Sequence, residues 1–241
     1  MNRDEILRLA GMPPGNPSYP FGPYRFVDRA FFTITYETDP DAIRAMVPEP
    51  LAPDGSNTVV YEWIAMPDSA GFGAYEESGV VIPCTFQGEA VNDTAMMFLD
   101  DEPPITAGRE IWGFPKRWGE PRLRVDRDTL TGTLVYGGER VAMGTMTYKH
   151  ETLCGDPQDC AAKLAKTHVN LKLIPCVTGA PKVAQLVAFS MTDIAVKGFW
   201  RGRARLHLVP HVQAPVADLP VHRVVEGRHV IADMTLPYGR V

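Results

Sequence analysis

The amino-acid sequence predicts a mainly β fold of the α+β class, built as an antiparallel β-barrel or double sheet with a few short helices. Short runs that alternate apolar and polar residues recur along the chain, and few segments show a helical pattern. The 241 residues include 22 Pro and 21 Gly, contents that suit a turn-rich β protein. With 45% hydrophobic residues the chain can bury a core, and we expect a single domain over residues 1–241.

The N-terminal segment has the clearest local signals. Residues 4–9 have the pattern of a short helix, and residues 30–36 (AFFTITY) alternate as a strand does. Asp39 followed by Pro40 is typical of a helix start, because a capping side chain then precedes a proline at the first helical position. Pro48 ends this second helix.

The rest of the chain predicts mostly strands. Gly137-Gly138 predicts a hairpin turn between two of them, and residues 157–167 could form a further helix. The predicted strands cover residues 57–66, 79–87, 95–99, 129–136, 140–149, 183–190, 203–209 and 229–236.

Charge and hydropathy exclude several classes of protein. A formal net charge of −5 argues against a nucleic acid as partner. No apolar run reaches the roughly 18–20 residues of a membrane span, and the N-terminus is charged where a signal peptide is apolar. We therefore expect a cytoplasmic protein without a membrane partner.

The cysteines are expected to be thiols in that compartment. Cys154 and Cys160, with His150 and His168 nearby, suggest a metal site. Their spacing is wider than that of a zinc knuckle, and no second cysteine pair follows, so we expect no metal.

Lys116 is the residue that most suggests chemistry. It lies in the stretch REIWGFPKRWGE, among Trp112, Phe114 and Trp118 and next to Arg117. A free lysine has a pKa near ~10.4, whereas attack on a ketone needs the neutral amine. Burial among apolar groups can lower that pKa by ~3–5 units, and a nearby cation acts in the same direction.

Strand geometry ranks these two causes. If residues 114–118 are extended, Phe114 and Trp118 share the side of Lys116, whereas Arg117 points away. We therefore expect burial to contribute more than Arg117 does to the lowered pKa. A structural interpretation stays open from the pattern alone, in which Lys116 is a lysine at a strand end with its stem packed on Trp118.

Several separated motifs resemble the acetoacetate decarboxylase family. They are GPYRF-x-x-R near the N-terminus, VPEPL, YEESG, GREIWGFPK, MTYKH, LKLIP and HVIADMTLP, in the family's order, and the similarity runs from about residue 17 to the end. The resemblance implies that family's fold. The family is itself a known example of an activated lysine, so the pKa argument is not independent of the resemblance.

The resemblance implies a set of catalytic residues. Lys116 matches the lysine that forms a Schiff base with a β-keto acid. Arg29 and Glu77 match a pocket arginine and a pocket glutamate, and Glu62 matches a second pocket acid, for which we expect Arg29 as partner. Arg117 stands where well-known members have a second lysine, so it retains the positive charge but cannot act as a nucleophile.

The resemblance also implies the wider pocket and the reaction. Phe114, Met97 and Arg117 are expected to line the substrate pocket. The expected reaction is decarboxylation of acetoacetate, a small anionic keto acid, to acetone and CO2, without a metal or organic cofactor. The alternatives are an aldolase-dehydratase acting on pyruvate-type keto acids and a non-catalytic barrel that binds small carbonyl compounds. A homo-oligomer, up to a dodecamer, is implied as well.

Overall fold

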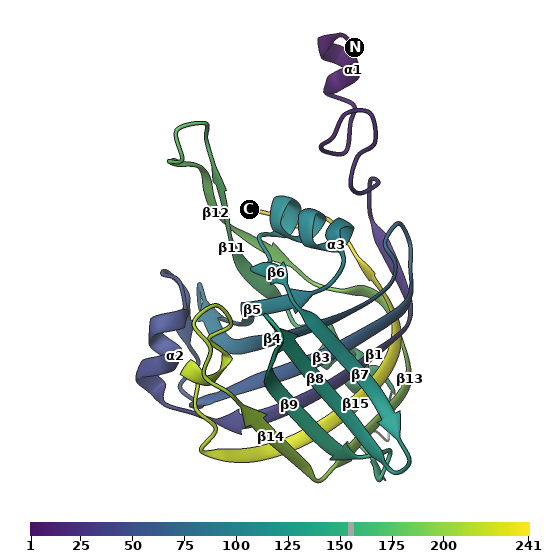
Figure 1. The fold of residues 1–241 in the computed structure, drawn as a ribbon, viewed down its shortest axis with the longest axis vertical. Coiled ribbons are helices and arrows are strands. Elements are labelled where there is room, and N and C mark those ends of the chain that lie inside the picture. The colour runs from purple at the N-terminus through teal and green to yellow at the C-terminus, as the bar shows by residue number, and fades with distance from the viewer. Residues whose placement is uncertain (154–156) are drawn as a thin grey trace.

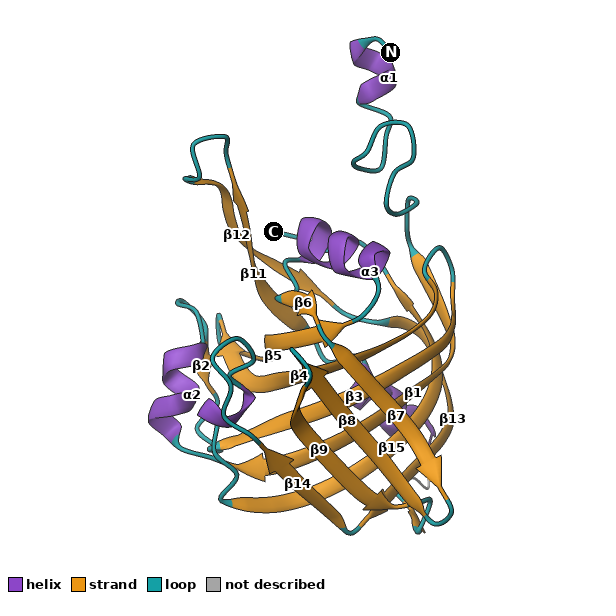
Figure 2. Cartoon of the chain, viewed as in Figure 1, coloured by secondary structure: helices purple, strands orange, loops and turns teal. Residues whose placement is uncertain are grey.

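The structure is a computed structural model that describes residues 1–153 and 157–241. Strands dominate these residues, and Figures 1 and 2 show a few short helices around them. The helical elements are α1 (Arg3–Ile6), α2 (Pro40–Met46), α3 (Glu102–Ala107), the π-helix η1 (Gly108–Trp112), α4 (Pro157–Leu164) and the 3-10 helix η2 (Val216–Asp218). The strands are β1 (Tyr24–Glu37), β2 (Ala52–Pro53), β3 (Thr58–Ser69), β4 (Gly73–Phe86), β5 (Glu89–Leu99), β6 (Lys116–Trp118), β7 (Glu120–Asp126), β8 (Thr129–Tyr136), β9 (Glu139–Thr147), β10 (Glu151–Thr152), β11 (His168–Pro175), β12 (Pro181–Phe189), β13 (Thr192–Gly202), β14 (Ala204–Leu208) and β15 (Arg223–Leu236).

The described strands form two sheets. The larger one has the order β10-β13-β15-β1-β3-β4-β5-β11-β12, with β2 paired to β4 and β6 paired to β5. The smaller one has the order β14-β9-β8-β7, and its strands cross in front of the larger sheet in Figure 1. Neither path closes on itself, so the prediction of a mainly β double sheet is confirmed, whereas a closed barrel is not formed.

The larger sheet has two apolar faces because successive side chains along its strands point to opposite faces, except at bulges. Phe32 and Trp63 point toward the smaller sheet and belong to the core between the sheets. Phe31 and Ile64, one residue away along the same strands, point to the opposite face, where a cavity lies. Residues of β1, β3, β4, β5, β11, β12, β13 and β15 all line this cavity, so the larger sheet curls around it.

Trp63 fixes how the two sheets meet. Its indole lies against Gly132 of β8 and Gly144 of β9, which are cross-strand partners. A Cβ at either position would come within 2.5 Å of the ring, so these glycines leave the space that the indole fills. Close packing of this kind gives the double sheet a defined geometry.

Most predicted elements are present. The hairpin is confirmed, because Gly137 and Gly138 both have positive φ between paired β8 and β9. Asp39 is the N-cap of α2, but its carboxylate contacts His222 Nε2 at 2.6 Å instead of capping the helix. The elements outside the predicted ranges are β2, β6, β7, β10, β11, β13, α3, η1 and η2. In the part of the chain that the structure describes, no helix is long and apolar enough to cross a membrane.

Candidate active site

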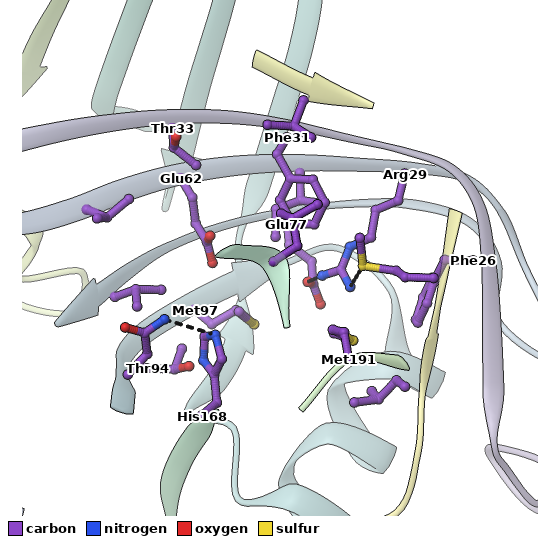
Figure 3. Close-up of a pocket in the computed structure, with 18 of the residues that line it drawn as sticks. Phe26, Arg29, Phe31, Thr33, Glu62, Glu77, Thr94, Met97, His168 and Met191 are labelled. Carbon is purple, nitrogen blue, oxygen red and sulfur yellow. Dashed lines mark hydrogen bonds and ion pairs between the residues drawn. The ribbon is translucent and has the colours of Figure 1, made fainter. Parts of the chain in front are cut away.

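The cavity on the concave face of the larger sheet has a volume of about 220 Å³. Five of the predicted site residues, Lys116, Glu77, Arg29, Glu62 and Met97, line it, and so does Phe114. Figure 3 shows the side chains of Glu62, Glu77 and Arg29 converging from neighbouring strands. The remaining predicted residue, Arg117, does not line it.

The floor of the cavity is the face of the larger sheet that lines it. On this floor, residues that are paired across neighbouring strands form rows. One row runs from Thr33 through Glu62 and Gly79 to Met97, and Met97 pairs with Lys116 of β6. Gly79 has no side chain, and a Cβ there would lie 2.5 Å from the carbonyl oxygen of Met96, so this glycine allows the backbone of β5 to approach closely.

A second row lies two residues further along the strands. It contains Phe31, Ile64 and Glu77. Two residues along a strand span about 7 Å, so long side chains can meet between neighbouring rows.

The segment before β6 delivers Lys116 to this floor. The π-helix η1 ends at Gly113, whose φ of +72° reverses the chain. The amide of Phe114 then donates to the carbonyl of Gly108 at 3.0 Å. Arg109 donates to the carbonyl of Lys116 itself at 3.2 Å. Helical turns of the π type often occur at functional sites, and this one fixes where the lysine enters the cavity.

Lys116 is a buried amine, with 6% of the residue exposed. Its Nζ lies 2.5 Å from Glu77 Oε1 and 5.2 Å from the centre of the Phe114 ring. Burial lowers the pKa of Lys116 below its ordinary value, Arg29 lowers it further, and Glu77 partly opposes both. The neutral amine is therefore more populated than it is in a solvated lysine.

Arg29 and Glu77 form the charged part of the cavity together with this amine. Arg29 NH2 lies 3.8 Å from Glu77 Oε2, and both residues are almost fully buried. The guanidinium lies 4.9 Å from the Phe26 ring and 4.8 Å from the Phe31 ring. Its Nε is buried and has no hydrogen-bond partner among the described residues, so one donor is available to a ligand.

Glu62 lines the same cavity from the row of Lys116. Burial raises the pKa of Glu62 to about 7, Arg29 lowers it, and Glu77 raises it. Glu62 makes no ion pair among the described residues, and the acid next to Arg29 is Glu77. Glu62 therefore does not form the expected ion pair with Arg29, although Arg29 is the cation that lowers its pKa.

Arg117 does not line the cavity, so the prediction that it belongs to the substrate pocket is corrected. Strand alternation turns it away from Lys116, and it donates to the Gln213 carbonyl at 2.7 Å and to the Tyr136 hydroxyl at 3.0 Å. Trp118 is 59% exposed and does not bury the lysine as predicted. The cation that acts on the pKa of Lys116 is Arg29, from β1, while burial is the largest cause, as expected.

Sequence reasoning missed a polar group at another part of the cavity, made by Asn92, Thr94 and His168. Asn92 and Thr94 are two residues apart on β5, so both side chains face the cavity. Met97 faces it as well, because an irregularity near residue 95 shifts the register. The predicted strand began at residue 95, so this alternation was outside it. The sequence suggests His168 only as a metal ligand.

The cysteines differ from the prediction in part. Cys84 and Cys176 are free, but Cys160 is disulfide-bonded, so the expectation of thiols is wrong there. Pairing of sulfur atoms depends on distances that the sequence does not contain. Cys154 lies outside the described residues. Among the residues that are described, no group of His, Cys, Asp and Glu could hold a metal ion.

Comparisons with known proteins agree on one family. The family model described as acetoacetate decarboxylase matches residues 11–241. Acetoacetate decarboxylase of Chromobacterium violaceum is 51% identical over 242 residues, which cover 100% of this chain and 97% of that protein. Acetoacetate decarboxylase of Burkholderia ambifaria is 54% identical over 238 residues, with 99% and 96% covered.

Solved structures give the same result. A solved structure of acetoacetate decarboxylase has a TM-score of 0.96 and 43% identity to this chain, and the match covers 100% of this chain and 98% of that one. The enzyme of that name from Legionella pneumophila has a TM-score of 0.93 and 45% identity, with 99% and 94% covered. The enduracididine biosynthesis enzyme MppR has a TM-score of 0.82 at 19% identity, with 96% and 93% covered, which shows a shared fold alone.

Proposed function

The chain belongs to the acetoacetate decarboxylase family, and on that premise we propose that it removes CO2 from acetoacetate through a Schiff base on Lys116. The observation that carries this proposal is a buried lysine amine, 2.5 Å from Glu77, in a cavity that also holds a buried arginine. It accounts for the three needs of the reaction: a neutral nucleophile, a site for a carboxylate and an acid–base group.

The first step is attack of the neutral Lys116 amine on the ketone carbon. Loss of water then gives a protonated imine, so the nitrogen carries a positive charge beside the carbon that will receive electrons. The lowered pKa of Lys116 favours this step, because the protonated amine has no lone pair to donate.

Arg29 would hold the substrate carboxylate. Its unpartnered Nε and its NH groups form a fork that matches two carboxylate oxygens. Glu77, 3.8 Å from Arg29, places a carboxylate near the same position. The negative charge of Glu77 disfavours the bound substrate carboxylate more than it disfavours neutral CO2. Binding of the substrate is therefore weakened relative to the transition state, in which the carboxylate loses its charge.

Cleavage of the bond to CO2 sends its electron pair into the imine and forms an enamine. A proton must then return to the enamine carbon. Glu77 lies next to the amine and could deliver that proton after its carboxylate has taken one up from water. Glu62, with a pKa of about 7, can exchange a proton near neutral pH and completes the acid–base set. Water finally hydrolyses the product imine and releases acetone and Lys116.

One experiment tests the proposal. The protein is incubated with acetoacetate and borohydride, the adduct is mapped by mass spectrometry, and CO2 release is measured in parallel without borohydride. We expect an adduct on Lys116 together with CO2, and we expect Lys116→Arg to abolish both because arginine stays protonated. Lys182→Arg, at an exposed position of β12, is the matched control and should leave both unchanged.

Other outcomes would refute the proposal. An adduct with pyruvate, without CO2 from acetoacetate, would indicate an aldolase-dehydratase. No adduct with either keto acid would leave a protein that only binds small carbonyl compounds. Turnover of Lys116→Arg near the wild-type level would exclude the Schiff base.

The remaining expectations stay predictions. A single domain, a homo-oligomer of up to a dodecamer and a cytoplasmic location follow from the sequence and the resemblance. Light scattering and cell fractionation test the oligomer and the location directly.

A further inference from the structure

The cavity extends beyond the group that the proposed reaction uses. On the far side of the Lys116 row from Glu77 lies a third row, in which Val60 pairs with Val81 and Val81 pairs with Thr94. Asn92 and His168 continue the lining in the same direction. In Figure 3, Thr94 and His168 lie at the opposite side of the cavity from Arg29 and Phe26.

This end of the cavity has polar atoms without partners. Thr94 is 4% exposed, and its hydroxyl has no hydrogen-bond partner among the described residues. The same holds for Nδ1 of His168, which is also buried. Leaving such a group unpaired costs about 1–3 kcal/mol, so a bound group that pairs with it gains binding.

Both groups present hydrogen-bond donors. The amide of Asn92 lies 3.4 Å from Nε2 of His168, and with the amide donating there the neutral ring carries its proton on Nδ1. Burial lowers the pKa of His168 to about 4, so the ring is neutral at physiological pH. The Thr94 hydroxyl can also donate, so the two groups suit an acceptor oxygen.

The two donors at this end carry no charge, so they would form no ion pair with an anion. His168 is neutral, and Glu62, in the adjacent row, is the acid next to it on the floor. Two cations also line the cavity, but Lys163 of α4 is exposed and Arg228 is paired with Glu226. Lys166 lowers the pKa of His168 without lining the cavity. A neutral oxygen, such as that of an ether, hydroxyl or carbonyl group, therefore fits better than a second carboxylate.

The position of Lys116 sets which part of a substrate reaches Thr94. With the carboxylate at Arg29 and the ketone carbon on Lys116, the acyl chain on the other side of the ketone points toward the third row. Rows are separated by about 7 Å along the strands. An acyl oxygen two bonds from the ketone carbon, together with a hydrogen bond of about 2.8 Å, covers much of the distance between the Lys116 row and the third row.

We propose that Thr94 and His168 form a specificity subsite that selects β-keto acids carrying a neutral acceptor oxygen in the acyl chain beyond the ketone. The proposal rests on the proposed function, since it takes Lys116 as the point of attachment. Acetoacetate, whose chain ends at a methyl group, would leave these donors unused.

A matched pair of substrates tests this subsite. 4-Methoxy-3-oxobutanoate and 3-oxohexanoate differ only by an ether oxygen in place of a methylene group. The readout is kcat/KM for 4-methoxy-3-oxobutanoate divided by kcat/KM for 3-oxohexanoate. This ratio is compared between the wild type and Thr94→Val, so that the intrinsic reactivity of the two ketones cancels. We expect Thr94→Val to lower the ratio three- to tenfold, about the value of one hydrogen bond.

Further variants separate this effect from a change in folding. The loss should fall mainly on KM, since the hydrogen bond is present before and during reaction. Thr94→Ser retains the hydroxyl and should keep the wild-type ratio. Thr131→Val, in β8 of the smaller sheet, makes the same substitution away from the cavity and should also keep it.

Acetoacetate turnover is measured for every variant as the reference. If the wild type does not release CO2 from acetoacetate, the proposed function fails. If it does, but Thr94→Val leaves the ratio at the wild-type value, the subsite proposal alone is overturned. A ratio that falls equally in Thr94→Ser and Thr94→Val also overturns it, because the hydroxyl would then not be the cause.

Discussion

Gly108 is predicted to be required for the position of Lys116. It has ordinary helical dihedrals, with φ of −59° and ψ of −45°, so alanine is compatible with its backbone. A Cβ there would lie 2.5 Å from Cδ of Lys116, 2.8 Å from Cε and 3.2 Å from Nζ. Carbon atoms in contact stay about 3.5–4.0 Å apart, so Gly108→Ala must move the lysine side chain by about 1 Å.

The size of the effect follows from that displacement. Misplacing a reacting group by about 1 Å can cost about 10²-fold in rate, which is about 2.7 kcal/mol of activation free energy. Stability should not fall, because alanine favours a helical conformation over glycine by about 1 kcal/mol. We therefore expect kcat for acetoacetate to fall about 100-fold while the thermal unfolding midpoint is retained.

Steady-state CO2 release measures kcat for acetoacetate, and borohydride trapping measures imine formation at Lys116. Gly15→Ala is the matched control, since its added Cβ would meet nothing within 4 Å. A Gly108→Ala protein that folds, turns over acetoacetate within about threefold of the wild type and traps normally would refute the reasoning. It would mean that the lysine side chain can shift without moving its amine from the reactive position.

Three further predictions concern charge. Arg29→Gln should raise the pKa of Lys116, because Arg29 lowers it, and should therefore move the acidic limb of the pH profile of imine formation to higher pH. Arg117→Ala should leave that limb in place, because Arg117 points away from Lys116. The reverse result would show that Arg117 is the cation that lowers the pKa of Lys116. Glu62→Gln should remove a titration near pH 7 from the profile of kcat/KM, and a profile that keeps this limb would exclude Glu62 as its source. Burial raises the pKa of Asp93 to about 7, above its unfolded value of about 3.9, so stability falls as pH rises between these values. Asp93→Asn should therefore raise the unfolding midpoint at pH 8 relative to the wild type more than at pH 5, and an equal change at both would contradict the assignment.

Local patterns were enough to predict much of the fold. The alternation in residues 129–136 and 140–149 and the Gly137-Gly138 turn predict a hairpin, because each signal lies within a few residues. The segment β13 (Thr192–Gly202) was missed. Its pairing with β15 contains two register shifts, so its alternation is broken.

The cavity depends on irregularities of the same kind. Phe26 and Arg29 would face opposite sides of a regular strand, yet both line the cavity. A register shift at Asp28, which has a positive φ, brings them to one face. A sequence pattern does not show where such a bulge occurs, so the contact between Arg29 and Phe26 could not be predicted.

The sequence by itself determined that one lysine has an apolar neighbourhood, that strands dominate, and that Arg117 would point away from Lys116. These properties depend on residues close together in the chain, where alternation and turn chemistry act. Only the tertiary structure decided that Arg29 faces Glu77 and that Trp118 is exposed. Such contacts join β1, β4 and β6 across the curled sheet, and their distances are set by register and curvature that no single segment encodes.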